Sequence, residues 1–299
     1  MKTHIKHYFH LHFIVFIWGF TAVLGKLISI DALPLVWYRM GIASLLVLGI
    51  AALRGYSLRV SKKTLLSLTI AGGALALHWV TFFMAIKVSN VSIALAAMST
   101  GAFFTAILEP IWYGRKMVWY ELLFGIVVIF GLFLIFKVET KYALGMLIAL
   151  LSAFMSVIFT LINGKLVQEE KPTLISFYEL SIGVILLSIY LLTQNSFTTN
   201  FFQLSQSDWI FIFILASFCT AYAFIGGVHV MKYISPYTVV LTVNLEPVYG
   251  IILAFIIFGD SEHMNPVFYV GALIIIATVI VNGILKNKDS LKKQGSERV

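Results

Sequence analysis

The chain has 299 residues, of which 60% are hydrophobic and only 11% are charged, whereas soluble globular domains carry about 25% charged residues. Together with a mean hydropathy of +0.97, this composition excludes a soluble globular protein and predicts a protein that crosses a membrane many times. The formal net charge of +8 does not indicate a nucleic-acid partner, because the basic residues lie between the apolar runs and at the two ends. The single cysteine, Cys219, excludes an internal disulfide.

Ten apolar runs are long enough to cross a bilayer, which takes about 20 mostly apolar residues in a helix. In chain order they cover approximately residues 10–30, 33–53, 64–86, 90–112, 117–136, 142–163, 173–193, 208–231, 236–258 and 266–285. Tryptophan and tyrosine recur near their ends, as expected at membrane interfaces. The predicted fold class is therefore an all-α polytopic membrane protein with ten transmembrane helices.

The first apolar run follows a basic start, as in a signal peptide, but no A-x-A-like cleavage site follows it. We therefore expect a retained first helix. Four histidines flank this run and form either a metal-binding tract or an interfacial flank: His4, His7, His10 and His12. Because no cysteine or acidic residue lies nearby, we favour the interfacial flank and expect neither a metal nor a cofactor.

The lysines and arginines outside the apolar runs are unevenly distributed. The N-terminal tail, the even-numbered loops and the C-terminal tail hold 16 of them, against four on the opposite side: Lys26, Lys87, Lys137 and Lys141. Since cytoplasmic loops carry the excess of positive charge, both termini are predicted in the cytoplasm, with the protein spanning the plasma (inner) membrane. An even number of helices agrees with this orientation.

An offset of about 140 residues aligns the two halves of the chain. Gly25-Lys26-Leu27 lies over Gly164-Lys165-Leu166, and Gly114 lies over Gly259. Chance similarity between apolar segments is the alternative. Each half holds five predicted helices, and an odd number makes the second copy enter from the opposite face, which is an inverted repeat. The predicted domains are a first five-helix repeat, a second one and a basic cytoplasmic tail, over residues 1–138, 139–286 and 287–299.

Three local patterns resemble one known family. They are Trp18-Gly19 in the first helix, Gly271-Ala272-Leu273-Ile274 in the last, and EPVYGIILAFIIFGD at residues 246–260. With ten helices in two halves, nearly the whole chain is similar to EamA-type members of the drug/metabolite transporter superfamily. Two positions depart from the family's pattern: Asp260 stands where Glu is usual, and Arg115-Lys116 stands in the first half where an acidic residue is expected.

The resemblance implies transport, in a fold where the first four helices of each half line a central cavity and the fifth lies outside. Inverted repeats place a site near the membrane midplane and alternate its access. We therefore expect a secondary transporter that exports a small organic solute, an amino acid or a related metabolite. The protein is expected to be a monomer or a homodimer. No ATP-binding motif is present, so a gradient must drive transport, and a proton is a candidate coupling ion.

The alternative function is an intramembrane enzyme acting on a lipid or a small metabolite, with Glu246, His78 and Arg39 converging on one site. The sequence contains no G-x-S-x-G nucleophile elbow, no H-E-x-x-H zinc motif and no phosphate-binding P-loop. We therefore favour a transporter and expect no enzymatic activity.

Glu246 is the first candidate site residue, because it falls near the middle of the ninth predicted helix. A charge at the centre of a bilayer costs about 2.5–3.5 kcal/mol on insertion scales. Thr242 and Tyr249 share its helical face, and Pro247 withholds a backbone N–H from the carbonyl of Val243, which would be free to bind a ligand. We expect Glu246 to bind a cationic group of the solute or a coupling proton. A hydrogen-bonded strut beside a packing kink is the alternative.

Further candidates for the cavity wall are polar and aromatic residues at membrane depth: Trp18, Thr21, His78, Trp79, Phe82 and Asn163. Helix packing is the alternative for each of them. Asn163 ends a polar stripe in the sixth helix whose other members we expect to pack against neighbouring helices, because small residues commonly mediate helix contacts in lipid. Those members are Ser152 and Ser156, and Thr160 completes the stripe.

Three charged residues inside or near the apolar runs are candidates for gates or ion pairs. Arg39 and Glu179 each follow the proline that opens the second helix of their half, and snorkelling to the interface is the alternative for both. Glu109 lies near Arg115, so we expect an ion pair or a gate at the cytoplasmic mouth, with substrate contact as the alternative.

Overall fold

The computed structural model describes residues 2–234, 236–243 and 245–296. These residues form helices and connecting turns, with no strand among them. The α-helices are α1 (Lys2–Leu27), α2 (Ala32–Leu53), α3 (Lys62–Val88), α4 (Val91–Met98), α5 (Gly101–Tyr113), α6 (Trp119–Val138), α7 (Ala143–Glu169), α8 (Pro172–Thr193), α9 (Gln206–Ala216), α10 (Ala223–Val230), α11 (Pro236–Val243), α12 (Glu246–Phe258) and α13 (Pro266–Ser296). Shorter 3-10 segments are η1 (Thr140–Tyr142), η2 (Thr199–Phe202) and η4 (Gly259–Glu262), and η3 (Ser217–Tyr222) is a π-helical segment between α9 and α10.

Eight stretches of the described residues are long and apolar enough to cross a membrane: Lys6–Leu27, Ala32–Leu53, Lys62–Val88, Val91–Tyr113, Trp119–Val138, Thr140–Glu169, Pro172–Thr193 and Gln206–Val230. The ninth predicted run is divided between α11 and α12, and the apolar part of α13, Pro266–Asn282, is shorter. The chain is therefore an all-helical, multi-pass membrane protein. A total of ten membrane helices stays a prediction.

Local sequence accounts for several helix ends. The Ser61 hydroxyl accepts a hydrogen bond from the Thr64 N–H at 3.0 Å and so caps the start of α3. Pro172 opens α8 at a position where its missing N–H costs no helical hydrogen bond. Gly114 ends α5 with a φ of 67°, a left-handed conformation that glycine adopts without strain.

Two of the predicted membrane helices are broken, and they are broken in the same way. The first consists of α4 with 8 residues and α5 with 13, and the second consists of α11 with 8 residues and α12 with 13. All four helices begin at matching positions, since Val91 and Pro236 are separated by the same 145 residues as Gly101 and Glu246. From the sequence we expect continuous helices here. The breaks fall at equivalent places in the two halves, which is where discontinuous helices form sites in transporters.

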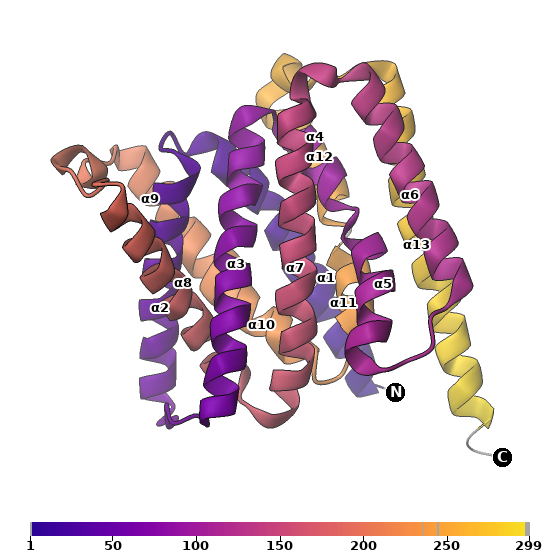
Figure 1. Cartoon of the computed structure of the whole chain (residues 1–299), viewed down its shortest axis with the longest axis horizontal. Helices are drawn as coiled ribbons and strands as arrows, with labels where there is room; N and C mark the ends of the chain where they lie inside the picture. Colours follow the sequence, from indigo (N-terminus) through magenta and orange to yellow (C-terminus); the bar gives the residue numbers. More distant parts are fainter. Residues whose placement is uncertain (1, 235, 244, 297–299) are drawn as a thin grey trace.

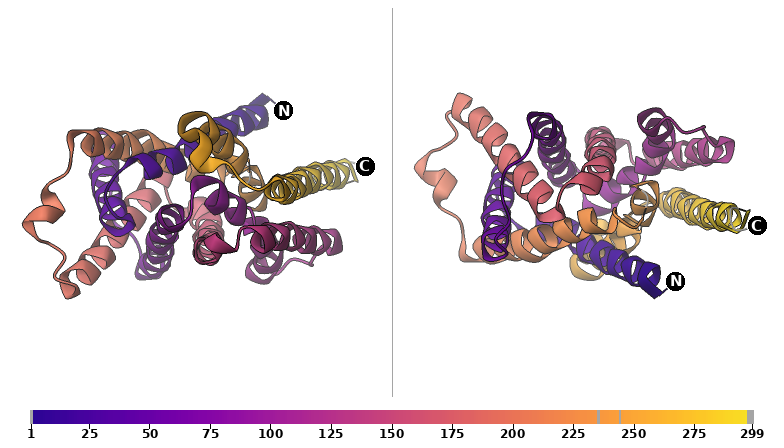
Figure 2. Two further views of the ribbon diagram at one scale, coloured as in Figure 1. Left: turned by 90° about the horizontal axis from the view of Figure 1, so that it is seen from above. Right: turned by 90° about the horizontal axis from the view of Figure 1, so that it is seen from below.

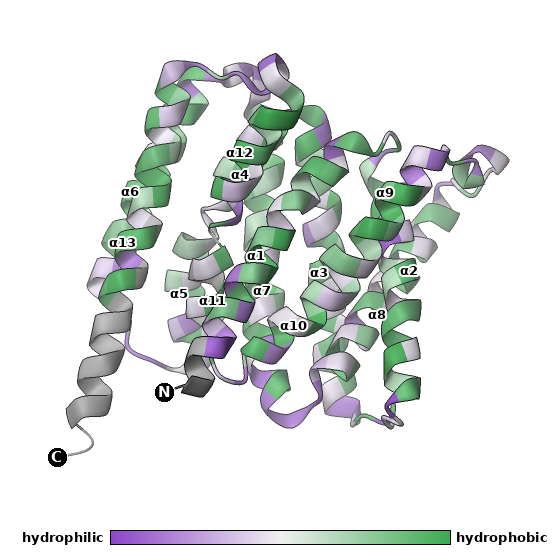
Figure 3. Cartoon of the chain, turned by 180° about the vertical axis from the view of Figure 1, so that it is seen from behind, coloured by the Kyte–Doolittle hydropathy of each residue, from purple (hydrophilic) through white to green (hydrophobic). Residues whose placement is uncertain are grey.

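The helices lie in a flattened arrangement, with a pair of helices at one edge and three helices at the other. Figure 1 shows α6 beside α13 at one edge, and α2, α8 and α9 at the other, with the remaining helices between them. Figure 2 shows the same order from above and from below. α6 and α13 approach closely where Gly131 faces Gly271. A Cβ on Gly271 would stand only 2.7 Å from the Gly131 carbonyl oxygen, so this approach requires a glycine. Figure 3 shows apolar residues along the helices and polar residues gathered mainly at their ends, as a membrane requires.

Polar contacts join the helices at the end opposite the two termini. Lys26 Nζ lies 2.7 Å from Glu262 Oε1, and Glu262 is 1% exposed. The Glu262 carboxylate also accepts hydrogen bonds from the Val91 and Ser92 N–H groups at 3.2 and 3.0 Å. It therefore caps the start of α4 and holds η4 and the end of α1 together.

Candidate functional site

A cavity lies at the centre of the molecule, between the two halves of the chain. It has a volume of about 100 Å³ and is partly open to solvent. Its lining comes from α1, α2, α3 and α4 in the first half, and from α7, the α10 region, α11 and α12 in the second. No lining residue comes from α6 or α13 in the described part of the chain.

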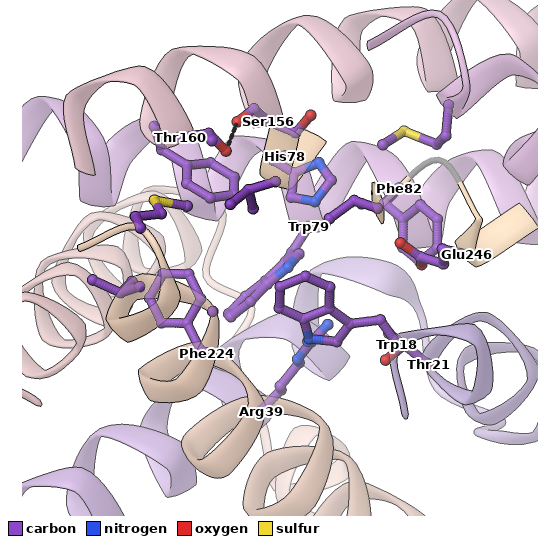
Figure 4. Close-up of a pocket in the computed structure, with 17 residues that line it drawn as sticks. Trp18, Thr21, Arg39, His78, Trp79, Phe82, Ser156, Thr160, Phe224 and Glu246 are labelled. Atoms are coloured by element: carbon purple, nitrogen blue, oxygen red, sulfur yellow. Dashed lines mark hydrogen bonds between the residues drawn. The ribbon is translucent and has the colours of Figure 1, made fainter. Parts of the chain in front are cut away.

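The lining combines an aromatic wall with a few polar groups. Five aromatic side chains take part: Trp18, Trp79, Phe82, Phe159 and Phe224. The polar members are Thr21, Arg39, His78, Ser156, Thr160 and Glu246, and the remaining members are Met98, Gly227, Val228, Met231, Val239 and Val243. Figure 4 shows Arg39 and Glu246 reaching the cavity from different helices, with the Trp18 ring drawn between them. Mostly apolar pockets with a few convergent polar groups are typical ligand sites.

Glu246 lies at the break of the second discontinuous helix. It is the first residue of α12, and Pro247 occupies the first turn of that helix. The break therefore differs from the kink expected from sequence, because a proline in a first turn removes no helical hydrogen bond. The carboxylate forms no hydrogen bond or ion pair with the described residues, and the charge that acts on it is that of Arg39.

Arg39 is held against the cavity by two contacts. Its Nε donates a hydrogen bond of 2.6 Å to Thr220 Oγ1, and its Cζ lies 3.8 Å from the centre of a Trp79 ring. Thr220 belongs to η3 and donates to the carbonyl of Leu215, five residues earlier, at 2.8 Å. The π-helical segment thus brings the Thr220 hydroxyl to Arg39, and π-helical segments often mark functional sites.

His78 connects the cavity wall to α7. Its Nδ1 lies 2.8 Å from Ser152 Oγ, and the Ser152 hydroxyl donates to the His78 carbonyl at 2.8 Å. The ring also packs against Phe82 and Phe159. A histidine at membrane depth needs a partner, and Ser152 is that partner.

Three other residues that are expected in the cavity from sequence do not line it. The Thr242 hydroxyl donates to the Thr238 carbonyl at 2.8 Å. Tyr249 packs edge-on against Phe16, since α12 turns this face towards α1. Asn163 donates from Nδ2 to Glu179 Oε2 at 3.1 Å.

The polar stripe of α7 divides between packing and the cavity. Ser156 and Thr160 line the cavity, whereas Ser152 bonds to His78 and Asn163 faces α8. From sequence we expect packing for the serines and the cavity for Asn163; Ser152 packs as expected, whereas Ser156 and Asn163 differ. Ser156, Phe159 and Thr160 face the cavity, whereas Asn163, almost one turn further along α7, bonds to Glu179 of α8.

The three charged candidates for gates or ion pairs have different surroundings. Arg39 faces the cavity as described. Glu179 is fully buried, accepts the hydrogen bond from Asn163, and forms no ion pair with a described residue. Glu109 lies 2.7 Å from Arg115, which also contacts Glu121 at 2.8 Å. Glu109 therefore belongs to a buried cluster of two carboxylates around one guanidinium and does not line the cavity.

Some lining and supporting residues gave no signal in the sequence. Phe224 and Met98 read as ordinary packing residues in apolar runs. Thr220 reads as a small polar residue in a helix, because the π-helical turn that aims its hydroxyl at Arg39 has no recognisable sequence pattern. The break between α4 and α5 could be predicted from sequence only by aligning the first repeat with the second, where Pro247 marks the equivalent break.

Comparison with known proteins identifies the family. The sequence matches the EamA-like transporter family twice, over residues 7–137 and again over residues 143–284. The chain belongs to the EamA-like transporter family. This family is part of the drug/metabolite transporter superfamily, as the resemblance indicated. The two matches cover nearly the whole chain and divide it between α6 and α7.

A solved structure supports the fold of this EamA-like chain. That structure, described only as "Crystal structure of protein", superposes with a TM-score of 0.71, covering 94% of this chain and 98% of its own. The sequence identity is 13%, so the similarity concerns the fold alone. No match was found among the curated proteins.

Proposed function

We propose that this protein is a secondary transporter that moves a small organic solute, an amino acid or a related metabolite, across the plasma (inner) membrane without changing it chemically. Membership of the EamA-like transporter family supports the class of function. The cavity between the two matched halves supports the mode of binding, because it joins an aromatic wall to one acidic and one basic side chain. The solute's own gradient or a proton gradient supplies the driving force.

Transport proceeds by alternating access between two inverted five-helix repeats. The matched breaks of α4/α5 and α11/α12 support this part of the proposal, as does the opposite direction of the two halves. In Figure 1, α1 begins at the bottom, where the N-terminus lies, and α7 begins at the top. Because the two repeats enter from opposite faces, their relative movement can open the same cavity to either side of the membrane.

The proposed direction is export, with both termini in the cytoplasm. The cavity wall includes Met231 and Val239, at the end of α10 and in α11. Figure 1 shows these helices in the half of the molecule that holds both termini. The other end is held together by the contacts of Lys26 and Glu262. This combination supports loading of the cavity from the cytoplasm.

The observation that carries the proposal is the position of Glu246 in the cavity, at a helix break and without a hydrogen bond or ion pair to any described residue. A carboxylate at membrane depth is costly unless it is paired. Glu246 therefore receives the cationic group of the solute or a coupling proton. Either partner offsets the cost of burying the charge.

The test is flux through purified protein in liposomes, measured with a panel of radiolabelled amino acids between pH 5.5 and 8. Glu246→Gln keeps the shape of the side chain and removes its charge, so it should lower flux at least tenfold or abolish its pH dependence. Glu169→Gln, the same change at an exposed carboxyl, is the control and should behave as the unaltered protein. Flux by Glu246→Gln equal to that of the unaltered protein at every pH contradicts the role of Glu246. A chemically changed product without flux supports the intramembrane enzyme instead.

A further inference from the structure

Arg39 is a buried cation with unused hydrogen-bonding capacity. Its side chain lines the cavity, and the residue is 1% exposed. Its one hydrogen bond to the described residues runs from Nε to Thr220, and none of those residues bonds to its Nη1. A guanidinium carries five N–H donors, and burying unpaired donors costs free energy. The cavity therefore presents donors that need an acceptor from a ligand.

Contacts at Nε and at one face hold the Arg39 guanidinium in place and leave its Nη groups for that ligand. Thr220 occupies the Nε position, and the Trp79 ring lies 3.8 Å from Cζ and covers one face of the group. Phe83 lies on Arg39 as well, with its ring centre 5.5 Å from Cζ. Neither Nη group of Arg39 forms a hydrogen bond with a described residue, and a guanidinium matches a carboxylate with two parallel hydrogen bonds.

The charges in the cavity decide which anion fits. Arg39 and Glu246 are its cationic and anionic lining residues, and His78 is already bonded to Ser152. A zwitterion places its carboxylate on Arg39 and its ammonium group on Glu246, so every charge is paired. A dianionic phosphate would add negative charge beside Glu246 with a single guanidinium to balance it. An amine without a carboxylate would leave Arg39 unpaired.

We propose that Arg39 is the binding site for the carboxylate of the transported solute, with Thr220 as its positioning residue. This inference rests on the proposed function and narrows the solute to a zwitterionic amino acid. The five aromatic lining residues supply an apolar surface for its side chain. Thr220 acts through its place in η3, where the bond to the Leu215 carbonyl orients the hydroxyl towards Arg39 Nε.

The test compares probes that differ in one charged group each. Binding to the purified full-length protein is measured by thermal shift for leucine and phenylalanine, for their decarboxylated amines, and for their deaminated acids, 4-methylpentanoate and 3-phenylpropanoate. At least one of the two amino acids should bind about 10- to 100-fold more tightly than its amine, as loss of a charged hydrogen-bond pair implies. If the amines bind as tightly as the amino acids, or if no probe with a carboxylate binds, the inference is wrong.

Variants separate this role from a structural one. Arg39→Gln should remove the preference for the amino acid over its amine, whereas Arg59→Gln, at an exposed arginine, should keep it. Thr220→Val should weaken amino-acid binding about tenfold and leave amine binding unchanged, and Thr220→Ser should restore it. A preference for the amino acid that survives in Arg39→Gln overturns the inference. Should that variant fail to fold, the probe comparison with the unaltered protein decides alone.

The same probes distinguish this inference from the proposed function. The Glu246→Gln variant should no longer bind the amines but should still bind the deaminated acids, because their binding needs Arg39 alone. If flux still depends on Glu246 while Arg39→Gln keeps full selectivity for the amino acid, the proposed function stands and the carboxylate site is elsewhere. If neither variant alters binding or flux, both proposals fail.

Discussion

At the scale of single residues, α7 and α8 share a buried polar contact apart from the cavity. Asn163 Nδ2 lies 3.1 Å from Glu179 Oε2, while Asn163 Oδ1 and Glu179 Oε1 have no hydrogen-bond partner among the described residues. Both residues are fully buried. A buried carboxylate without a cation costs several kcal/mol, so this contact joins the two helices without being optimal for stability.

Replacing the Glu179 carboxylate by its neutral amide should therefore not destabilise the protein. Glu179→Gln keeps the size of the side chain and an acceptor for Asn163, and we expect its midpoint of unfolding in detergent to equal or exceed that of the unaltered protein. Glu179→Leu leaves the Asn163 amide unpaired and should lower stability by about 1–3 kcal/mol. A strong loss of stability in Glu179→Gln would contradict this account and indicate that the charge itself is required.

Sequence alone identified the residues whose chemistry is unusual in lipid. Glu246, Arg39 and His78 stand out because each places a polar or ionisable group where burial is costly, and all three line the cavity. Residues that act through geometry could not be found this way. The role of Thr220 depends on a π-helical turn, and the packing of Tyr249 against Phe16 depends on how α12 faces α1 after the break.

At the scale of helices, the beginning of α4 is stabilised from a distant part of the chain. Asn90 Oδ1 accepts a hydrogen bond from the Ile93 N–H at 2.8 Å, as a local cap does. Glu262 adds a carboxylate on the Val91 and Ser92 N–H groups and on the Ser92 hydroxyl, the last at 2.7 Å. The sequence could predict the Asn90 cap but not the Glu262 contacts, because about 170 residues separate the partners. Those contacts exist only once the two halves have packed together.

Removing the Glu262 carboxylate should destabilise α4 and its contact with α1. We expect Glu262→Ala to lower the free energy of unfolding by at least about 2 kcal/mol, because a single hydrogen bond to a charged group contributes about 1.5–3 kcal/mol and the Glu262 carboxylate accepts three. Unfolding by a detergent titration measures the change. Asp260→Ala, at an exposed position two residues earlier, is the control and should shift the midpoint little. Equal midpoints for the two variants would show that the Glu262 cap does not stabilise the protein.

At the scale of the whole molecule, the charge bias and the fold agree on which loops share a side. Figure 1 shows the loop between α2 and α3 at the same end of the helices as both termini, at the bottom of the view, and the segment between α8 and α9 towards the opposite end. Ser57 and Thr198 are exposed residues of these two connections. Because the loop around Ser57 belongs to the side rich in lysine and arginine, the positive-inside rule predicts it in the cytoplasm and Thr198 outside.

Cysteine labelling in intact cells tests this orientation. The buried Cys219 is first replaced by serine, so that no native thiol reacts, and a cysteine is then introduced as Ser57→Cys or Thr198→Cys. A membrane-impermeant maleimide should label Thr198→Cys in intact cells and Ser57→Cys only after the membrane is opened. The reverse pattern would place both termini outside, and loading of the cavity from the cytoplasm would then have to be abandoned. Labelling of both sites in intact cells would mean that the two connections lie on one side, which is incompatible with the odd number of crossings that an inverted repeat requires.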